Sequence, residues 1–240
     1  MVQDPVCMMT INPQHAAGML DYEGKKYYFC SDNCLEKFRA QPSIYLNQAL
    51  GMHLTIGVMG SADFDEPEHV RQMAYELGKV IAQKEYVLIT GACPGLPYEC
   101  ARGVSETGGM SIGISPALSL DEHIHKYDSP SDTYDVIIYT GSGLMGREVT
   151  NIRSSDMVIL VGGQSGTLGE FAIAYDEGKL IGVLEGSGGI TSQLPDLIKS
   201  LRKQTGAMVI YENNPQELVE KMVNYYSTEH YRRPSCFCSE

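Results

Sequence analysis

The chain has 240 residues, 18 basic and 30 acidic side chains and a formal net charge of −12, a length that allows one or two domains. The acidity disfavours nucleic acid and anionic membranes as partners, because both require clustered Lys and Arg. No apolar run reaches the roughly 20 residues of a membrane span, and the N-terminus lacks the basic-then-apolar order of a signal peptide. We therefore expect a cytoplasmic protein that binds neither nucleic acid nor membrane.

The charge is unevenly distributed along the chain. Residues 1–47 carry 4 basic and 5 acidic side chains, and residues 227–240 carry 2 of each. Residues 48–226 carry 12 basic and 23 acidic side chains, so the excess of negative charge belongs to the long middle segment. An anionic ligand bound there must be held by local geometry and not by a general positive field.

Three of the seven cysteines, Cys7, Cys30 and Cys34, lie near the N-terminus. An odd number of cysteines without a secretory signal argues against a disulfide framework. Three closely spaced thiols in a reducing compartment are typical of a soft-metal site.

The segment around these cysteines predicts a small α+β unit. Tyr27–Phe29 has the composition of a strand that ends at the second cysteine. Ser31 is the expected N-cap of a helix that carries the third cysteine, and Pro42 closes that helix. Residues 41–51 then form a linker or a short helix.

Three stretches of this segment resemble the YHS domain, a TRASH-like metal-binding module, over residues 3–47. They are DPVCMM (4–9), YEGKKYYFCSDNCLEKF (22–38) and PSIY (42–45). The resemblance implies a metal-binding domain over residues 1–47, with zinc or copper bound by Cys7, Cys30 and Cys34. Met8 stands where the family commonly has Gly.

A fourth metal ligand is not evident from the sequence. His15, a water molecule or a thiol from Cys236 and Cys238 in the C-terminal tail are the alternatives. A reduced, metal-free module, whose cysteines pack as ordinary small hydrophobic residues, is the other interpretation.

From His53 onward, short apolar segments alternate with amphipathic ones, which predicts a parallel sheet covered by helices on both faces. The expected fold class is a doubly wound, Rossmann-like α/β domain over residues 52–226, followed by a tail over residues 227–240. The expected strands are 53–59, 86–90, 110–115, 134–140, 157–161, 180–184 and 207–211. The expected helices are 68–83, 98–107, 145–154, one through 171 and 175, 196–204 and 215–226.

Glycines follow several of these strands, at the sheet edge where such folds bind ligands. The loop 162–170, GGQSGTLGE, brings a backbone rich in glycine to the start of a helix, which makes an anion site without any Lys. Thr167 adds a hydroxyl there. Tight packing of the turn is the alternative role of the glycines, and a capping box with Thr167 is the alternative role of Glu170.

The same loop resembles the P-G-G-x-G-T-x-x-E motif of the LOG family, within the SLOG group of Rossmann-like folds. Gly163, Gly166, Thr167 and Glu170 are kept, whereas Gly162 replaces the proline and Gln164 the second glycine. Arg147 has the spacing of the family's functional arginine. The segments Gly60-Ser61 and TGACPGLP (90–97), with Gly91 and Gly95, match its two earlier ligand loops.

The LOG resemblance implies a phosphoribohydrolase, which splits a nucleoside 5′-monophosphate into base and ribose 5-phosphate. Glu170 would stabilise positive charge on the ribose, Arg147 would grip the phosphate or assist the departing base, and the loop would cradle the phosphate. It also implies a homodimer. Pyridoxal phosphate is not expected, because no Schiff-base lysine is marked. The alternatives are a non-catalytic nucleotide or phosphorylated-cofactor sensor regulated by metal, and a metal chaperone.

Several other residues have competing interpretations. Arg153 is a second candidate for the site or one member of a surface ion pair. Cys93 and Cys100 flank a ligand loop, where a small buried residue is the commoner role of a cysteine. His123 and His125 are expected on a solvated surface, since positions i and i+2 diverge on a helix.

Overall fold

The structure is a computed structural model that describes residues 2–7, 9–22, 24–40, 42–45, 53–63 and 65–230. The chain divides into two compact units, Met1–His53 and Leu54–Glu240. Each unit is described by itself. Met8, most of the 41–51 linker and the tail cysteines Cys236 and Cys238 lie outside the described residues.

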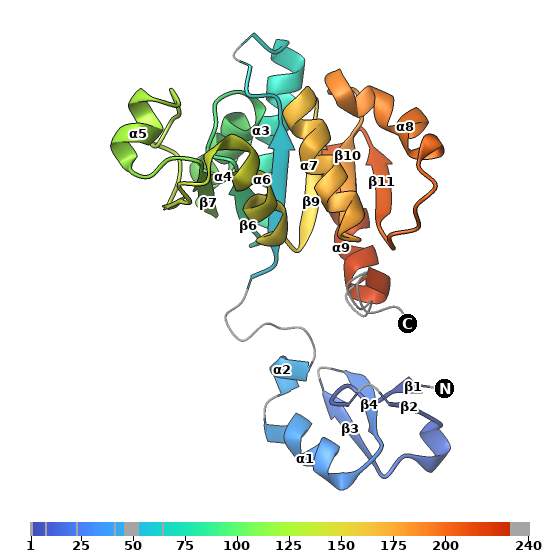
Figure 1. Cartoon of the computed structure of the whole chain (residues 1–240). Helices are drawn as coiled ribbons and strands as arrows, with labels where there is room; N and C mark the ends of the chain where they lie inside the picture. Colours follow the sequence, from blue (N-terminus) through green and yellow to red (C-terminus); the bar gives the residue numbers. More distant parts are fainter. Residues whose placement is uncertain are drawn as a thin grey trace. The chain divides into compact units, whose positions relative to one another are not determined.

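The first unit consists of two small antiparallel sheets and two helices (Figure 1). The helix α1 begins directly after Ser31, whose Oγ accepts a hydrogen bond from the Cys34 backbone N–H at 3.3 Å, so the predicted N-cap is confirmed. Gly24, with φ of +76°, forms the tight turn of the second hairpin. The elements are β1 (Val2–Gln3), β2 (Thr10–Ile11), η1 (Pro13–His15), β3 (Gly18–Tyr22), β4 (Lys25–Phe29), α1 (Asp32–Ala40) and α2 (Pro42–Tyr45).

The core of the first unit is a cluster of aromatic rings around Phe38. The rings of Tyr27 and Phe29 lie 5.1 Å from the Phe38 ring, and those of Tyr22 and Tyr45 lie 6.0 and 6.2 Å from it. The fully buried apolar side chains of this cluster are few, which leaves little hydrophobic stabilisation for a unit of this size.

The second unit is built on a seven-stranded parallel sheet, in the order β11-β10-β9-β5-β6-β7-β8. The chain adds strands outward from β5 to β8 and then crosses to the other side of β5, where β9 begins the second half. β5 and β9 are therefore neighbours at the point where the strand order reverses. The strands are β5 (Thr55–Gly60), β6 (Val87–Thr90), β7 (Met110–Ser115), β8 (Val136–Tyr139), β9 (Met157–Val161), β10 (Leu180–Leu184) and β11 (Met208–Glu212).

Helices cover both faces of the sheet, as the sequence predicts (Figure 1). One apolar cluster joins the sheet to α3, α4 and α9, and a second joins its other face to α6, α7 and α8. The expected helix 68–83 and the expected strands 110–115, 157–161 and 180–184 have the bounds observed. The helices are α3 (Glu68–Gln83), α4 (Leu96–Thr107), α5 (Leu120–His125), α6 (Gly143–Arg153), α7 (Ser165–Asp176), η2 (Gly189–Gln193), α8 (Leu194–Ser200), α9 (Pro215–Tyr225) and η3 (Tyr226–His230).

The solvated position expected for His123 is wrong. His123, on α5, is fully buried, whereas His125 is exposed. The His123 Nδ1 atom lies 2.9 Å from Ser115 Oγ, and Nε2 lies 2.9 Å from the Pro130 carbonyl oxygen. Helix periodicity indicates only that the two side chains point in different directions, and here the loop between α5 and β8, through Pro130, contacts the face that carries His123.

Replacing His123 with Ala is expected to destabilise the second unit by about 2–4 kcal/mol. The substitution leaves a cavity and removes the partners of the Ser115 hydroxyl and the Pro130 carbonyl. Chemical denaturation followed by circular dichroism measures the change. His125→Ala, on the exposed face of the same helix, is the control and should change stability by less than about 0.5 kcal/mol. Equal stability of the two variants would show that the buried imidazole makes no net contribution.

Candidate functional site: a ligand pocket and a thiol cluster

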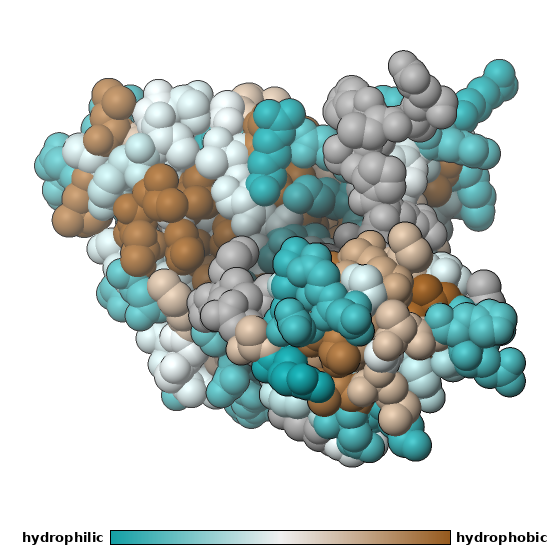
Figure 2. Space-filling view, turned by 90° about the horizontal axis from the view of Figure 1, so that it is seen from below, coloured by the Kyte–Doolittle hydropathy of each residue, from teal (hydrophilic) through white to brown (hydrophobic). Residues whose placement is uncertain are grey.

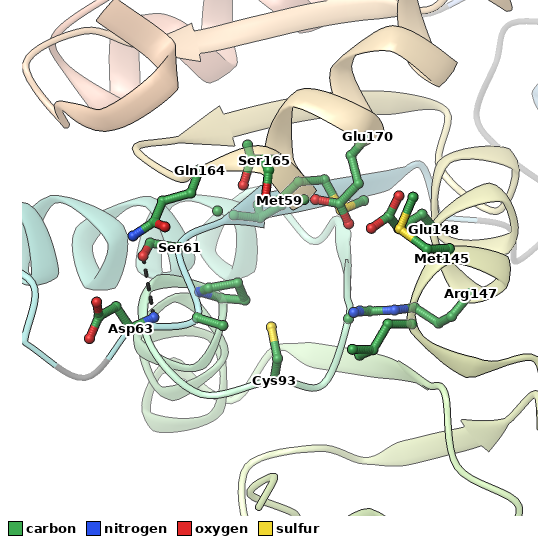
Figure 3. A pocket seen from close by; sticks show the side chains of 18 residues that line it. Met59, Ser61, Asp63, Cys93, Met145, Arg147, Glu148, Gln164, Ser165 and Glu170 are labelled. Carbon is green, nitrogen blue, oxygen red and sulfur yellow. Dashed lines mark hydrogen bonds between the residues drawn. The ribbon is translucent and has the colours of Figure 1, made fainter. Parts of the chain in front are cut away.

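A cavity of about 640 Å³ lies at the carboxyl ends of β5, β6 and β9, where the strand order reverses (Figure 3). It collects residues from four separate stretches of the chain. Among the described residues, its lining is Val58–Asp63, Gly91, Cys93, Pro97, Leu144, Met145, Arg147, Glu148, Gln164–Thr167 and Glu170. Of the residues expected at the ligand site, Gly60, Ser61, Gly91, Arg147, Gly166, Thr167 and Glu170 therefore lie together on its wall.

The two remaining expected residues, Gly95 and Gly163, are not among the described lining residues. A Cβ atom on Gly163, with φ of +88°, would stand 2.1 Å from Thr167 Oγ1, so this glycine makes room for the threonine. A Cβ atom on Gly95, with φ of +75°, would stand 2.3 Å from the Ser61 carbonyl oxygen. These contacts favour the packing role left open above for both glycines, and their expected ligand role stays a prediction.

The start of α7 forms one wall of the cavity. Gln164 and Ser165 line the cavity next to Gly166 and Thr167, so the glutamine that replaces a motif glycine reaches the site itself (Figure 3). The first backbone N–H groups of a helix have no partner within the helix, and its dipole favours negative charge there. This wall therefore presents hydrogen-bond donors and a partial positive charge.

Arg147, on α6, is the cationic side chain of the cavity among the described residues. It is only 7% exposed, and its Nε atom has no hydrogen-bond partner in the described part of the chain. The guanidinium lies on Gly91, where a Cβ atom would stand 1.4 Å from Nη1. Asn151 lies one turn later on α6. With its amide nitrogen oriented toward Thr90, the Asn151 side chain donates a hydrogen bond to the Thr90 carbonyl (3.1 Å) and accepts one from the Gly91 N–H (3.2 Å).

Two buried carboxylates, Glu148 on α6 and Glu170 on α7, lie beside one another in the cavity (Figure 3). Burial raises the pKa of Glu170 to about 7, against the attraction of Arg147, and the negative charge of Glu148 adds to the rise. Burial also raises the pKa of Glu148, and Arg147 opposes this shift. The sequence interpretation did not assign Glu148 and Asn151 to the site; the position of Asn151 four residues after Arg147 was the available signal.

Three interpretations left open by the sequence are resolved by these contacts. Arg153 forms an ion pair with Glu177 (2.7 Å) outside the cavity lining, so it is the surface residue. No capping hydrogen bond joins Glu170 to Thr167 among the described residues, and the glutamate lines the cavity instead. Cys100 is buried, whereas Cys93 lines the cavity, where burial raises the pKa of its thiol and Arg147 lowers it.

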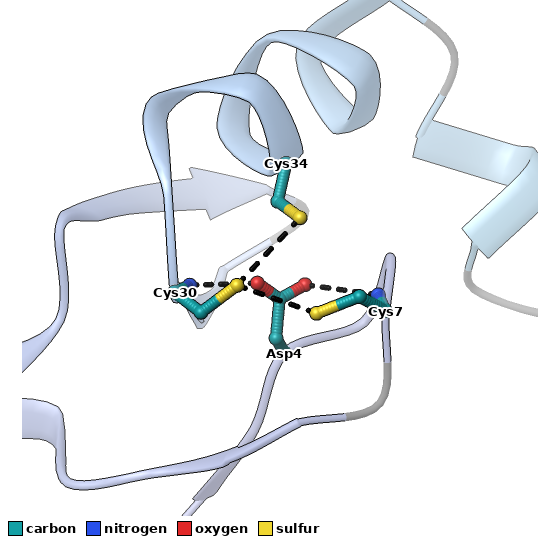
Figure 4. A group of neighbouring side chains, drawn as sticks. All are labelled: Asp4, Cys7, Cys30 and Cys34. Atoms are coloured by element: carbon teal, nitrogen blue, oxygen red, sulfur yellow. Dashed lines mark hydrogen bonds between the residues drawn. The ribbon is translucent and has the colours of Figure 1, made fainter.

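In the first unit, Cys7, Cys30 and Cys34 come together as the sequence predicts (Figure 4). Cys30 is central, since its Sγ lies 3.3 Å from the Cys7 Sγ and 3.8 Å from the Cys34 Sγ. Cys34 is buried, Cys30 is half-buried and Cys7 is exposed. One ligand atom from each, and one from Asp4, lie within 4.8 Å of one another, which is a geometry suited to a metal ion.

Asp4 was not among the alternatives for a fourth ligand. Its fully buried carboxylate accepts hydrogen bonds from the backbone N–H groups of Cys30 (2.7 Å), Val6 (2.8 Å) and Cys7 (3.4 Å). Burial alone would raise the pKa of Asp4, but these N–H groups hold it below its usual value. The nearby Asp4 carboxylate, followed by Cys7, raises the pKa of the Cys30 thiol to about 12. His15 does not belong to this group of described residues.

These two sites define the class of protein. A Rossmann-like fold is joined in one chain to a cysteine-rich module with metal-binding geometry. Residues 53–219 match the SLOG cluster4 family, and the chain belongs to that family. Residues 2–49 match the YHS domain, so both family resemblances noted in the sequence are confirmed. No helix in the described ranges is long and apolar enough to cross a membrane.

Two of the relatives that match by sequence cover different shares of the chain. An uncharacterized protein of Archaeoglobus fulgidus is 37% identical over 132 residues, which cover 55% of this chain and 80% of that protein. A copper-transporting P-type ATPase of Rhizobium leguminosarum bv. viciae is 47% identical over 45 residues, which cover 19% of this chain and only 5% of the ATPase. The ATPase thus shares one short segment with this chain.

Solved structures share the fold of the second unit. The molybdenum cofactor carrier protein from Chlamydomonas reinhardtii is 29% identical at a TM-score of 0.61, covering 74% of this chain and 100% of that one. The molybdenum cofactor binding protein from Rippkaea orientalis is 28% identical at a TM-score of 0.60, covering 74% and 99%. DNA processing protein A from Helicobacter pylori, at 17% identity and a TM-score of 0.51, covers 71% and 80% and shows the fold alone.

Proposed function

We propose that the cavity binds a nucleoside 5′-monophosphate or another phosphorylated cofactor, and that the thiol cluster binds zinc or copper. The observation that carries the first part is Arg147. A guanidinium that is 7% exposed, with an unpaired Nε, faces a cavity whose opposite wall is the start of α7. A buried arginine and free helix N–H groups together bind a phosphate. The two similar molybdenum cofactor proteins support a cofactor as the ligand.

Replacing Arg147 with Ala is expected to weaken nucleotide binding about 100-fold, because hydrogen bonds to charged groups contribute about 1.5–3 kcal/mol each. Isothermal titration with AMP, GMP and CMP measures the affinity. Arg153→Ala is a matched control, since it removes an arginine from the same helix but breaks only the ion pair with Glu177. If both variants bind as the wild type does, the phosphate does not contact Arg147.

Hydrolysis of the N-glycosidic bond is the second candidate function, and Glu170 favours it. Cleavage of this bond places positive charge on the ribose, which a buried carboxylate stabilises. Glu170 lies in the cavity within the electrostatic influence of Arg147. Incubation with AMP, GMP and CMP, followed by chromatography, tests for free base. Base release that disappears in Glu170→Gln supports an enzyme; binding without turnover over hours supports a sensor.

The presence of both units in one chain favours regulation of the cavity by metal in the sensor alternative. Coupling between two sites is reciprocal, so metal at the thiol cluster would change nucleotide affinity and nucleotide would change metal affinity by the same factor. The test is a nucleotide titration of the metal-loaded and metal-free protein. Equal affinities in the two forms would exclude the regulation and leave two independent binding units.

The homodimer expected from the sequence has a candidate interface at β8, the edge strand of the sheet. Eight large hydrophobic residues around β8, α5 and the start of α6 are exposed; Figure 2 shows hydrophobic residues at the left of the view, where α5 lies in Figure 1. Since the segment 48–226 has a net charge of −11, two copies meet best through an apolar surface. The patch consists of Leu118, Leu120, Ile124, Val136, Ile138, Tyr139, Leu144 and Met145.

Ile138→Glu is expected to convert a dimer into a monomer, because it places a charge in the centre of an apolar contact. Ile138 is 46% exposed, so the fold tolerates the change. Sedimentation equilibrium at several protein concentrations measures the mass. Leu201→Glu, an exposed apolar residue outside the patch, is the control and should remain dimeric. A monomeric wild type would remove the proposal.

A further inference from the structure

The cavity has an unfavourable charge for a phosphorylated ligand. The charged side chains among its described lining residues are one guanidinium, that of Arg147, and the carboxylates of Asp63, Glu148 and Glu170. Asp63 is exposed at the rim, but Glu148 and Glu170 are 6% and 7% exposed. A phosphate monoester carries a charge of about −1.5 to −2 at pH 7. A ligand phosphate would therefore meet more negative than positive charge.

Glu148 is the carboxylate that lies beside the start of α7, where the ligand phosphate would bind. Its Oε1 is 3.8 Å from the position of a Cβ on Gly166, and its Oε2 is 3.0 Å from that of a Cβ on Gly169. Both glycines belong to the first turns of α7, the wall that offers N–H groups to the phosphate. Within the described residues, Glu148 forms no ion pair and accepts no hydrogen bond, and Arg147 is the charge that opposes its raised pKa. An ionised carboxylate that is 6% exposed and has no hydrogen-bond partner is unfavourable beside a phosphate site, so a compensating group is expected there.

We propose that the cavity takes its phosphorylated ligand together with a divalent cation of the magnesium type, which Glu148 shares with the phosphate. The inference rests on the proposed function of the cavity. Mg²⁺ in proteins is commonly held by one or two carboxylates, the ligand phosphate and several waters, and not by a complete protein cage. The unpaired, buried Nε of Arg147 marks the cavity independently as an anion site, and the cation removes the repulsion between that anion and Glu148.

The cation and the phosphate are expected to bind cooperatively. A cation alone would meet Arg147, and a phosphate alone would meet Glu148, so each ligand relieves the cost of binding the other. This site differs in chemistry from the thiol cluster of the first unit, because magnesium prefers oxygen ligands whereas zinc and copper prefer sulfur. The test is calorimetric titration of the full chain with AMP in magnesium buffer and in EDTA. Because EDTA also removes zinc and copper, the same comparison is made with a protein that lacks the central thiol of the first unit.

The expected result is an affinity for AMP at least tenfold higher in magnesium than in EDTA. Glu148→Gln should remove this dependence and should bind AMP in EDTA more tightly than the wild type does. A merely structural role of Glu148 would not produce that gain. Cys30→Ser, which removes the central thiol of the first unit, should keep the magnesium dependence and so excludes the thiol cluster as its source.

Two outcomes would overturn the proposal in different ways. Equal AMP affinity of the wild type in magnesium and in EDTA excludes the cation and leaves the proposed ligand site intact. Absence of binding of AMP, GMP and CMP in both buffers contradicts the proposed function and the cation together. If Glu148→Gln fails to fold, Glu148→Ser, with a shorter neutral side chain, provides the same comparison.

Discussion

Glu170→Gln is expected to stabilise the second unit against unfolding by about 3 kcal/mol at pH 8, although it removes a residue of the proposed ligand site. The side chain is 7% exposed, and its pKa is about 7, compared with an ordinary value of 4.5. Arg147 and a hydrogen bond with Asn151 favour the ionised form, but burial, with the charge of Glu148, outweighs them. The ionised carboxylate is therefore less stable in the folded protein than in the unfolded chain.

The sign of the pH dependence follows from this raised pKa. The contribution of Glu170 to stability is fully present below about pH 4.5 and is lost as the pH rises through about 7. Glutamine stays neutral throughout, so the variant and the wild type should have the same stability near pH 4.5 and diverge by pH 8. Urea denaturation in EDTA, followed by circular dichroism at the two pH values, measures the difference.

The exposed Glu229 supplies the control for this prediction. Glu229→Gln removes the same charge from the surface of the second unit and should change stability by less than about 0.5 kcal/mol. A Glu170→Gln protein that is less stable than the wild type at pH 8 would show that the carboxylate is well compensated in the folded state. Increased stability combined with lost binding or turnover is the pattern of a residue kept for function at a cost in stability.

Much of this fold follows from local patterns in the sequence. The helix 68–83 and the strand 157–161 have their predicted bounds, because their apolar spacing coincides with their burial in the two cores. α5 was not predicted, since only six residues form it. Its burial of His123 depends on contacts with Ser115 and Pro130, which the topology brings close and the helix period does not describe.

The sequence predicted most of the residues that meet at the site, but not the balance of positive and negative charge within it. Glycine loops after parallel strands meet at one sheet edge, so Gly60, Gly91 and Gly166 were expected together. The place of Glu148 beside Gly166 and Gly169 depends on how α6 packs against α7, which no single segment encodes. Asp4 is similar: its carboxylate binds the N–H of Cys30, 26 residues away, and only the folded first unit shows that contact.

Cys30→Ser is expected to lower the affinity of the first unit for zinc or copper about 100-fold or more and to unfold that unit within the full chain. The Cys30 Sγ lies 3.3 Å from the Cys7 Sγ and 3.8 Å from the Cys34 Sγ. The substitution therefore removes the ligand atom that lies between the other two thiols. The second unit has its own core and should keep its unfolding transition.

The expected loss of structure follows from how little else stabilises the first unit. Among its described residues, the buried apolar side chains are Phe29, Cys34 and Phe38, with a few half-buried rings around them. A core of this size seldom maintains a fold alone, and metal binding to a small cysteine-rich unit contributes directly to its folding free energy. Chelation of the wild type should have the same effect as the substitution, since both remove the bond between the metal and the thiols.

Metal content per chain and the near-ultraviolet circular dichroism of the tyrosines measure these effects together. Cys93→Ser is the matched control, because it removes a thiol from the cavity of the second unit and should keep both the metal and the spectrum. If Cys30→Ser retained bound metal and the tyrosine signal, Asp4 with the other two thiols would suffice as ligands. If the wild type kept its tyrosine signal after chelation, the aromatic cluster around Phe38 would be stable without metal, and the cysteines would pack as ordinary hydrophobic residues.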